Sequence, residues 1–249
     1  MRRFGALVSV FIAVVGLVAC GDDDAPKGPQ PLSRVQSERL AQAGYMNLQA
    51  RGARFEANSA FLGVGDGESL TLVGEIDWAN HAGRAVVRGE GAEAGVAEVY
   101  WQDTIVLERR PAMDSLVASR GGPAAAWIAR TPDKSQRQLD RLLAIILGLA
   151  MEQPDNAVLI QQGEDNAFIR TDELRGTAVE VLRYGNRSLY WLDANDGTML
   201  RFEGNSVAGN APTIVDFISH QEVTIPRPTE ADVVPFDSVA EIYGAFVGG

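Results

Sequence analysis

The sequence has one cysteine, two histidines and two lysines, and its longest apolar run is too short to cross a bilayer. A single thiol, at Cys20, cannot form a disulfide within the chain or a cysteine-rich zinc site. His81 and His220 lie far apart in the sequence, and no Gly-x-Ser-x-Gly motif accompanies them. These absences indicate neither a histidine-based hydrolase nor a metal site, so we expect no catalytic residue, metal ligand or cofactor.

Negative charge dominates the chain. Its 249 residues include 33 acidic and 22 basic side chains, which gives a formal net charge of -11 at pH 7. Phosphate backbones are bound by Lys and Arg, so we expect no nucleic-acid partner. We also do not expect the protein to lie flat on anionic lipid, and therefore assign the membrane contact to a fatty anchor.

The N-terminus predicts export and anchoring. Arg2 and Arg3 precede an apolar stretch at 4–18, an order typical of a secretory signal. The segment Leu17-Val18-Ala19-Cys20 resembles the lipobox of bacterial lipoproteins. This resemblance implies a signal peptide at 1–19, acylation of Cys20 by fatty acids such as palmitate, and a lipid anchor in the cell membrane on its extracytoplasmic (periplasmic or cell-surface) side. An ordinary signal peptide that contains an incidental cysteine is the alternative.

Residues 20–31 are acidic, contain several prolines and glycines, and have almost no apolar content. They predict a solvated, flexible tether between the lipidated Cys20 and the folded body. Residues 32–249 suit a single domain, because no linker-like break interrupts them.

Alternation of apolar and polar residues predicts strands through most of the body. In the first half we expect a helix at 32–48 and an antiparallel meander of strands at 55–62, 70–78, 84–88, 96–101 and 104–107. In the second half we expect strands at 158–160, 167–170, 177–182, 189–192, 199–202 and 213–225, and a short helix at 237–246. Tight turns are predicted at 184–187 and 195–197, because Gly and Asn tolerate positive φ.

A helix of different character is predicted at 134–150, between the two β blocks. Its residues 142–150 are apolar on every side, whereas a surface helix has one apolar stripe. Nine residues are too few to cross a membrane, so the apolar side chains on both sides of this helix must be buried against something else. One cover is expected to be the sheet, and the other is a bound lipid, a partner or simply more protein.

Two antiparallel β blocks with helices on one side predict an α+β fold. A sheet of nine to eleven strands must curl to protect its faces, so we expect a half-barrel with helices on its concave side. Apolar positions of matching periodicity would line a ligand cavity there, or else fill an ordinary core. The candidate cavity residues are Leu70, Leu72, Ile76, Trp78, Val99, Trp101, Leu142, Ile146 and Leu149.

The segment Ser188–Phe202, with the sequence SLYWLDANDGTMLRF, resembles a hairpin of the LolA-like superfamily. That superfamily includes the lipoprotein carrier LolA, RseB-type sensors and the actinobacterial LppX/LprG lipoproteins. Val99–Val106 resembles an earlier strand-turn-strand of the family more weakly. The resemblance implies the curled sheet, and in some members an apolar cavity that carries lipid. Asp193–Gly197 also superficially resembles a calcium loop, but its twelfth position is Gly204, so a hairpin turn is the better interpretation.

The expected function is that of a membrane-anchored envelope lipoprotein that binds or carries a hydrophobic ligand, such as a lipid or acyl chain, in an apolar cavity. The alternative is a non-catalytic envelope signalling sensor or adaptor that has the same fold, a filled cavity and an envelope protein partner. A hydrolase whose acid and base residues the sequence does not mark is a third hypothesis. A filled interior would favour the adaptor over the carrier.

Overall fold

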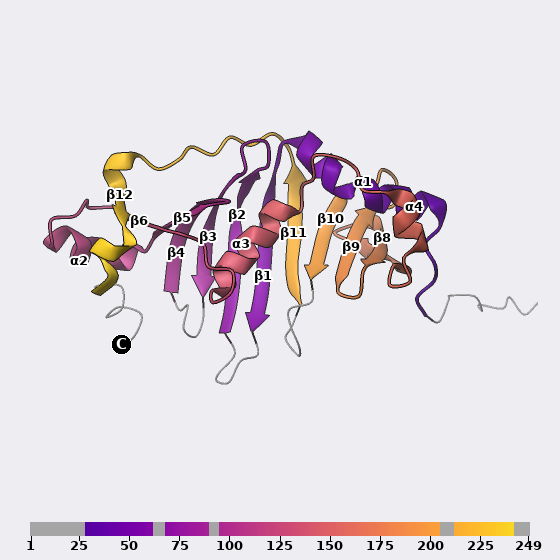
Figure 1. The fold of residues 1–249 in the computed structure, drawn as a ribbon, viewed down its shortest axis with the longest axis horizontal. Helices are drawn as coiled ribbons and strands as arrows, with labels where there is room; N and C mark the ends of the chain where they lie inside the picture. The colour runs from indigo at the N-terminus through magenta and orange to yellow at the C-terminus, as the bar shows by residue number, and fades with distance from the viewer. Residues whose placement is uncertain (1–27, 62–67, 90–94, 205–211, 242–249) are drawn as a thin grey trace, which may run out of the picture.

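The structure is a computed structural model that describes residues 28–61, 68–89, 95–204 and 212–241. The predicted signal peptide at 1–19, Cys20, most of the tether at 20–31 and the end of the helix expected at 237–246 lie outside these residues. One long, curled sheet forms the body, and helices lie along one of its faces (Figure 1). The α+β fold class predicted from the sequence is confirmed.

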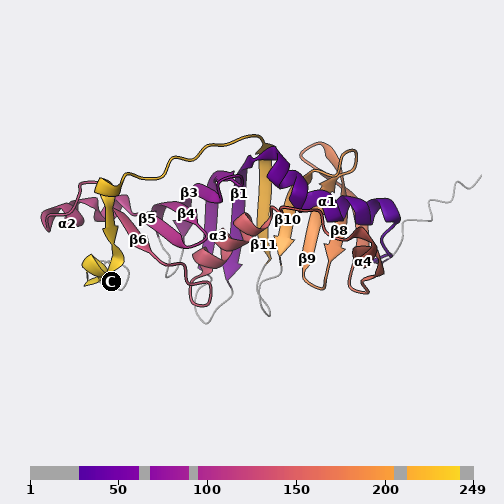
Figure 2. The ribbon, with the colours of Figure 1, turned by 45° about the horizontal axis from the view of Figure 1, so that its top comes forward.

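The sheet has twelve strands in the order β12-β6-β5-β4-β3-β2-β1-β11-β10-β9-β8-β7. Its strand pairs are antiparallel except β12 and β6, which run parallel. The sheet remains open, with β12 and β7 at opposite edges (Figures 1 and 2). The strands are β1 Gly52–Phe61, β2 Glu68–Asp77, β3 Ala82–Gly89, β4 Gly95–Gln102, β5 Ile105–Arg109, β6 Trp127–Arg130, β7 Ala167–Leu174, β8 Thr177–Tyr184, β9 Ser188–Asp193, β10 Met199–Gly204, β11 Thr213–His220 and β12 Val233–Pro235.

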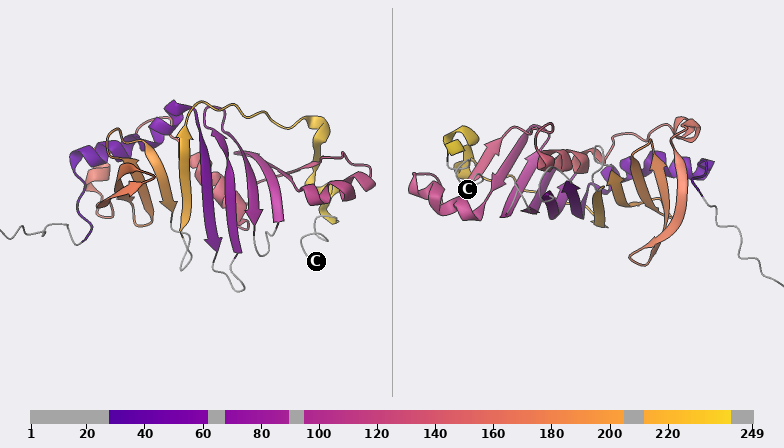
Figure 3. Two further views of the ribbon diagram at one scale, coloured as in Figure 1. Left: turned by 180° about the vertical axis from the view of Figure 1, so that it is seen from behind. Right: turned by 90° about the horizontal axis from the view of Figure 1, so that it is seen from below.

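Strand β11 joins the two predicted β blocks into one sheet, because it pairs with β1 on one side and β10 on the other. A bulge in the β1–β11 pair leaves Ile218 without a partner residue on β1. Next to this bulge, Arg175 of the β7–β8 turn donates to the carbonyl oxygen of Phe217 at 2.6 Å and to Asp216 at 3.2 Å. The second half of the sheet therefore curls until its outermost hairpin reaches β11 (Figure 3).

Helices α1 (Arg34–Ala50), α3 (Gln138–Gly148) and α4 (Ala157–Gln162) lie along one face of the sheet, and α2 (Asp114–Ser119) lies near the β12 edge (Figures 1 and 3). A capping box starts α1: the Ser33 hydroxyl accepts from the Gln36 backbone N–H at 3.2 Å, and the Ser33 N–H donates to the Gln36 side chain at 3.0 Å. Among the described residues, no helix is both long and apolar enough to cross a bilayer.

The expectations for several elements were wrong. Residues 158–160, predicted as a strand, belong to α4, because the Asn156 side chain accepts from the N–H groups of Val158 and Leu159 and so caps a helix. A short apolar run carries no periodicity that separates a helix from a strand. Strands β6 and β12 were missed, so the sheet exceeds the expected nine to eleven strands. Helix α3 begins later than expected, and β11 ends at His220.

Two glycines allow the strands of the first half to pack closely. Gly83 on β3 pairs with Trp101 on β4, and a Cβ at Gly83 would lie 2.1 Å from the Trp101 ring. A Cβ at Gly74 on β2 would lie 2.3 Å from the carbonyl oxygen of Arg84. The indole of Trp101 therefore covers bare backbone, a contact that any side chain at Gly83 would remove.

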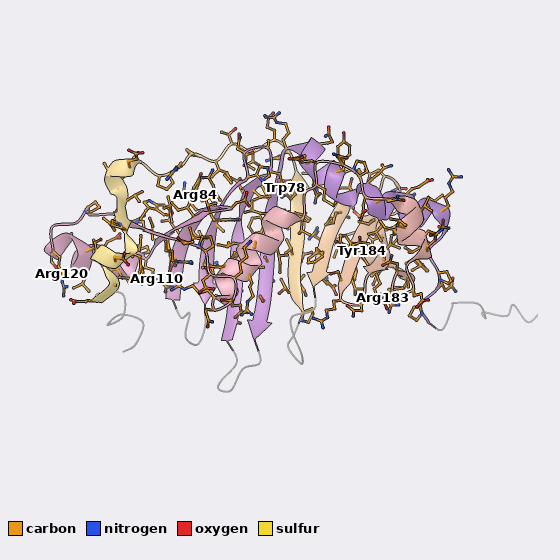
Figure 4. All side chains as sticks on the ribbon, in the orientation of Figure 1. Trp78, Arg84, Arg110, Arg120, Arg183 and Tyr184 are labelled. Atoms are coloured by element: carbon orange, nitrogen blue, oxygen red, sulfur yellow. The ribbon has the colours of Figure 1, made fainter. Side chains whose placement is uncertain are left out.

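A buried polar cluster ties α1 and α3 to the sheet. Trp78 Nε1, just after β2, donates to the carbonyl oxygen of Ile146 at 3.2 Å, and Asn47 Nδ2 of α1 donates to that of Leu149 at 2.8 Å. Both acceptors belong to the C-terminal end of α3, where carbonyls lack partners within the helix. His220 Nε2 lies 3.1 Å from Asn47 Oδ1, and its ring stacks on Trp78. Figure 4 shows Trp78 at this junction, midway along the sheet.

We predict that Gly83→Ala lowers the free energy of unfolding by about 1–3 kcal/mol, because the new methyl group overpacks against Trp101. Gly148→Ala is the matched control: a Cβ at Gly148 meets no atom within 4 Å, and alanine favours a helix over glycine by up to about 1 kcal/mol. Urea unfolding of both variants measures the effect. Equal stability of the two variants would contradict the close packing described for Gly83.

We predict that the stability of the protein falls as the pH is lowered from about 7.5 to 5.5, in part because of His220. Burial lowers the pKa of His220 below its ordinary value of 6.5, against a smaller opposing effect of the Asp196 charge. In this range the unfolded chain therefore binds a proton that the folded protein resists, and unfolding becomes easier.

The variant His220→Gln keeps a donor for Asn47 and removes the titration, so its loss of stability between pH 7.5 and 5.5 should be smaller than that of the wild type. Denaturant unfolding at both pH values measures this difference. Gly148→Ala, which changes no titratable group, serves as the control and should keep the wild-type pH response. The same pH response in His220→Gln and the wild type would rule out this role for His220.

Candidate functional site

The structure brings all nine candidate cavity residues together in one hydrophobic core between α3 and the sheet. Eight of them are 0–1% exposed, and Leu149 is 6% exposed. Seven are enclosed by other side chains: Leu70, Leu72, Ile76, Trp78, Val99, Leu142 and Ile146. The remaining two border hollows, Trp101 a groove beside α3 and Leu149 a smaller hollow beside α4. The nine residues thus share one core, and the space between them is occupied by their own side chains.

The groove beside α3 has a volume of about 330 Å³ and opens to solvent. It lies between the outer side of α3, the turn between β4 and β5, and the segment that leads from β6 to α3. Its walls are formed by His81, Trp101, Gln102, Asp103, Val106, Pro132, Lys134, Asp140, Leu143, Ala144, Leu147, Gly148 and Ala150. Helix α3 thus has its inner side in the core and part of its outer side in this groove.

The groove has an apolar floor and a polar rim. Trp101, Val106 and Leu143 are buried, and they contribute the floor. His81 Nδ1 and Asp103 Oδ2 lie 3.7 Å apart at the rim, where Lys134 adds a positive charge. The indole N–H of Trp101 is buried without a hydrogen-bond partner among the described residues. Such a site favours an apolar group flanked by hydrogen-bond acceptors.

A network of buried charges fixes the first turn of α3 beside the groove. Arg130 of β6 donates to both oxygens of Asp140, at 2.6 and 2.7 Å, and the backbone N–H of Asp133 donates to the same carboxylate at 2.6 Å. The Glu108 carboxylate lies 2.7 Å from Arg110 and 3.5 Å from Arg130. These carboxylates are neutralised by arginines, so their arrangement suits the positioning of α3 better than proton transfer.

Sequence reasoning missed this network. Arg130 and Asp140 carry almost fully buried side chains, although charged residues are normally exposed. One feature of the sequence could have indicated the network: Glu108 and Arg110 lie at the end of the apolar strand β5. A charged side chain on a buried strand needs a partner of opposite charge. Nothing in the spacing pairs Asp140 with Arg130, because that contact depends on how α3 crosses the sheet.

The smaller hollow, of about 40 Å³, lies where α1, α4 and the end of α3 meet. Tyr190 and Tyr184 are among its walls, and the Tyr184 hydroxyl donates to Asp155 at 2.8 Å. Burial raises the pKa of Tyr190 to about 12, so this phenol stays neutral at physiological pH. A hollow of this size holds at most a water molecule or two, and it offers no room for a ligand.

The turn Asp193–Gly197 is a hairpin turn, as interpreted from the sequence. Asp193 Oδ1 accepts from the Asn195 N–H at 2.7 Å, and Asp196 Oδ1 accepts from the Thr198 N–H at 2.8 Å. Gly197 has a φ of 81°, in the left-handed region that the turn requires. Both carboxylates therefore hold the turn together.

Comparison with known proteins finds similarity to solved structures. No family model matches the chain, and no curated protein matches its sequence. The chain is similar to MucB in the complex of MucA and MucB from Pseudomonas aeruginosa, with 17% identity and a TM-score of 0.30 over 77% of this chain and 56% of that one. A crystal structure of MucB alone gives 18% identity and a TM-score of 0.29 over 77% and 58%.

A DUF1329 family protein from Desulfovibrio piger is similar with 10% identity and a TM-score of 0.33, over 78% of this chain and 96% of that one. This chain spans less than two thirds of the length of the MucB chains. At these identities and TM-scores, no statement about activity or partners follows for this protein.

Proposed function

We propose that the protein is a non-catalytic envelope lipoprotein adaptor, anchored through Cys20, which binds an apolar segment of a protein partner in the groove beside α3. The observation that carries this proposal is the filled interior: the residues expected to surround a lipid pack against one another instead. The groove outside α3 is then a concave, partly apolar surface that is open to a ligand.

A carrier would have to open the space between α3 and the sheet. Leu139, Leu142, Leu143 and Ile146 of α3 are 0–2% exposed, and exposing each one costs about 1.5–3 kcal/mol. Lifting the helix would also break the bonds that Trp78 and Asn47 make to its last carbonyls. These costs favour a helix that stays in place, which suits an adaptor with a fixed binding surface.

The chemistry of the groove fits a peptide better than a whole lipid. Its floor around Trp101 and Leu143 accepts one or two apolar side chains, and its rim at Lys134 and Asp103 offers charges to a backbone or polar side chains. A net charge of -11 would steer a basic partner toward the protein. The buried carboxylates of Asp140 and Glu108 are occupied by arginines, which supports binding instead of catalysis.

One observation favours the carrier as a second candidate. The floor of the groove is apolar, so it would suit an acyl chain as well as the apolar side chains of a peptide. A single acyl chain lying along the outer side of α3 would then be the ligand.

We predict that Cys20→Ser moves the protein from the membrane fraction to the soluble fraction of the envelope, because one residue carries the lipid. Fractionation of cells that express the full-length chain measures this, and mass spectrometry of the N-terminal peptide identifies the acyl groups. Val73→Ser, at an exposed position on the opposite face of the sheet, should stay in the membrane fraction. Membrane association of Cys20→Ser equal to the wild type would refute the anchor.

We predict that a photo-reactive amino acid at Ala144, in the groove, forms a discrete adduct of protein mass in cells. The same amino acid at Val96, an exposed position on β4 that lies outside the groove, should form none. Gel electrophoresis and mass spectrometry separate protein adducts from lipid adducts. Adducts of lipid mass alone at Ala144 would replace the adaptor by the carrier, and the absence of any adduct there would remove the groove as a binding site.

A further inference from the structure

The chain enters the fold at the β7 end of the sheet. The backbone of Gln30 exchanges two hydrogen bonds of 2.8 Å with Phe168 of β7, so the last part of the predicted tether already adds to this sheet edge. Two residues later Leu32 is buried, and its carbonyl oxygen accepts from Gln161 of α4 at 3.5 Å. The start of the described chain and α4 therefore lie at the same end of the molecule (Figures 1 and 3).

Exposed apolar side chains gather at this end. Val158 and Leu159 of α4 are 59% and 64% exposed, the highest values among the large apolar side chains of the described residues. Met151, which follows α3, is 44% exposed and borders the same hollow as Tyr184, which is 38% exposed. Single exposed apolar residues need no explanation, but four at one end of an acidic protein do.

Hydrogen bonds and burial hold α4, which carries Val158 and Leu159, in place. The Asn156 side chain caps α4, and Ile160 is buried against the core. Asn166 Nδ2 donates to the Ile160 carbonyl oxygen at 2.7 Å, which closes the other end of the helix. The segment before α4 is bound to α1, because the Met151 N–H donates to the Gly44 carbonyl oxygen at 3.0 Å. Val158 and Leu159 are thus held outward by a fixed helix.

We infer that this end of the molecule rests on the lipid bilayer, with Val158 and Leu159 inserted among zwitterionic phospholipid headgroups. The inference rests on the proposed lipid anchor at Cys20, which lies ten positions before Gln30. Ten residues span at most about 36 Å when extended, and roughly 17–19 Å on average as a flexible chain. The anchor therefore keeps α4 within reach of the bilayer at a high effective concentration.

The local chemistry identifies the kind of surface. Glu152, Asp155 and Glu164 flank the apolar side chains, so an anionic bilayer would repel this end, whereas a zwitterionic one accepts it. The contact would then depend on apolar burial and respond weakly to salt. Tyr184 suits the same boundary, because a phenol presents an apolar ring and a polar hydroxyl to a membrane surface. In this inference the protein surface at α4 adds a second membrane contact to that of the fatty anchor.

The test uses the mature chain, coupled through its Cys20 thiol to a maleimide lipid in phosphatidylcholine vesicles. An environment-sensitive fluorescent amino acid is placed at position 159, and in a second protein at position 218, where Ile218 is 51% exposed on β11. We expect attachment to lower iodide quenching at position 159 by about fivefold and to leave position 218 unchanged. Replacing Val158 by Ser should reduce this protection, because less apolar area is then buried.

Chemical coupling separates this inference from the proposed anchor. Equal quenching at position 159 before and after attachment would overturn the membrane contact, even if Cys20 proves to be acylated in cells. Protection of position 218 instead would show that another face meets the bilayer. Protection of position 159 without vesicles would point to a second copy of the chain and would overturn the inference as well. An unfolding curve equal to the wild type shows that each labelled protein is folded.

Discussion

The attachment of α3 to the sheet is the constraint on which the rest of the structure depends. Its last carbonyls accept from Trp78 and Asn47, so the helix cannot tilt away without leaving two buried donors unpaired. Its first turn is held by the bidentate contact between Asp140 and Arg130. Because both ends are fixed, the apolar inner side of α3 stays in contact with β2 and β3, and the interior is filled.

The two attachments differ in kind. At the C-terminal end, neutral donors satisfy carbonyls that a helix always leaves free, which places little charge in the core. At the N-terminal end, a buried carboxylate and guanidinium must offset the cost of their own desolvation, and the additional contact of Arg130 with Glu108 makes the geometry unique. Charge pairing of this kind fixes orientation more than it adds stability. It therefore fixes the orientation of α3, which forms one wall of the groove.

The sequence predicted those parts of the fold that repeat a local pattern. Strand β2 was placed within two residues, because Leu70, Leu72 and Ile76 alternate with polar residues and all three face the core. Helix α4 and strand β6 were not found, because four to six apolar residues do not reveal a period. The nine core residues were chosen because their spacing places them on the apolar faces of the strands and of α3. Such spacing does not distinguish a cavity from a filled core. Long-range pairs such as Asn47 with Leu149 leave no trace in local sequence.

The way in which the N-terminal residues join the β7 edge of the sheet limits where the protein can bind a partner. Gln30 is paired with β7, Leu32 is buried and α1 begins at Arg34. The sheet edge and the first helix are therefore connected without a linker. With Cys20 as the proposed anchor, ten positions before Gln30, the β7 edge is the part of the sheet next to the membrane. The groove lies nearer the middle of the sheet, beside α3 and the β4–β5 turn. Under this geometry a partner segment must itself come close to the membrane, which favours the part of a membrane protein next to its membrane span over a freely diffusing one.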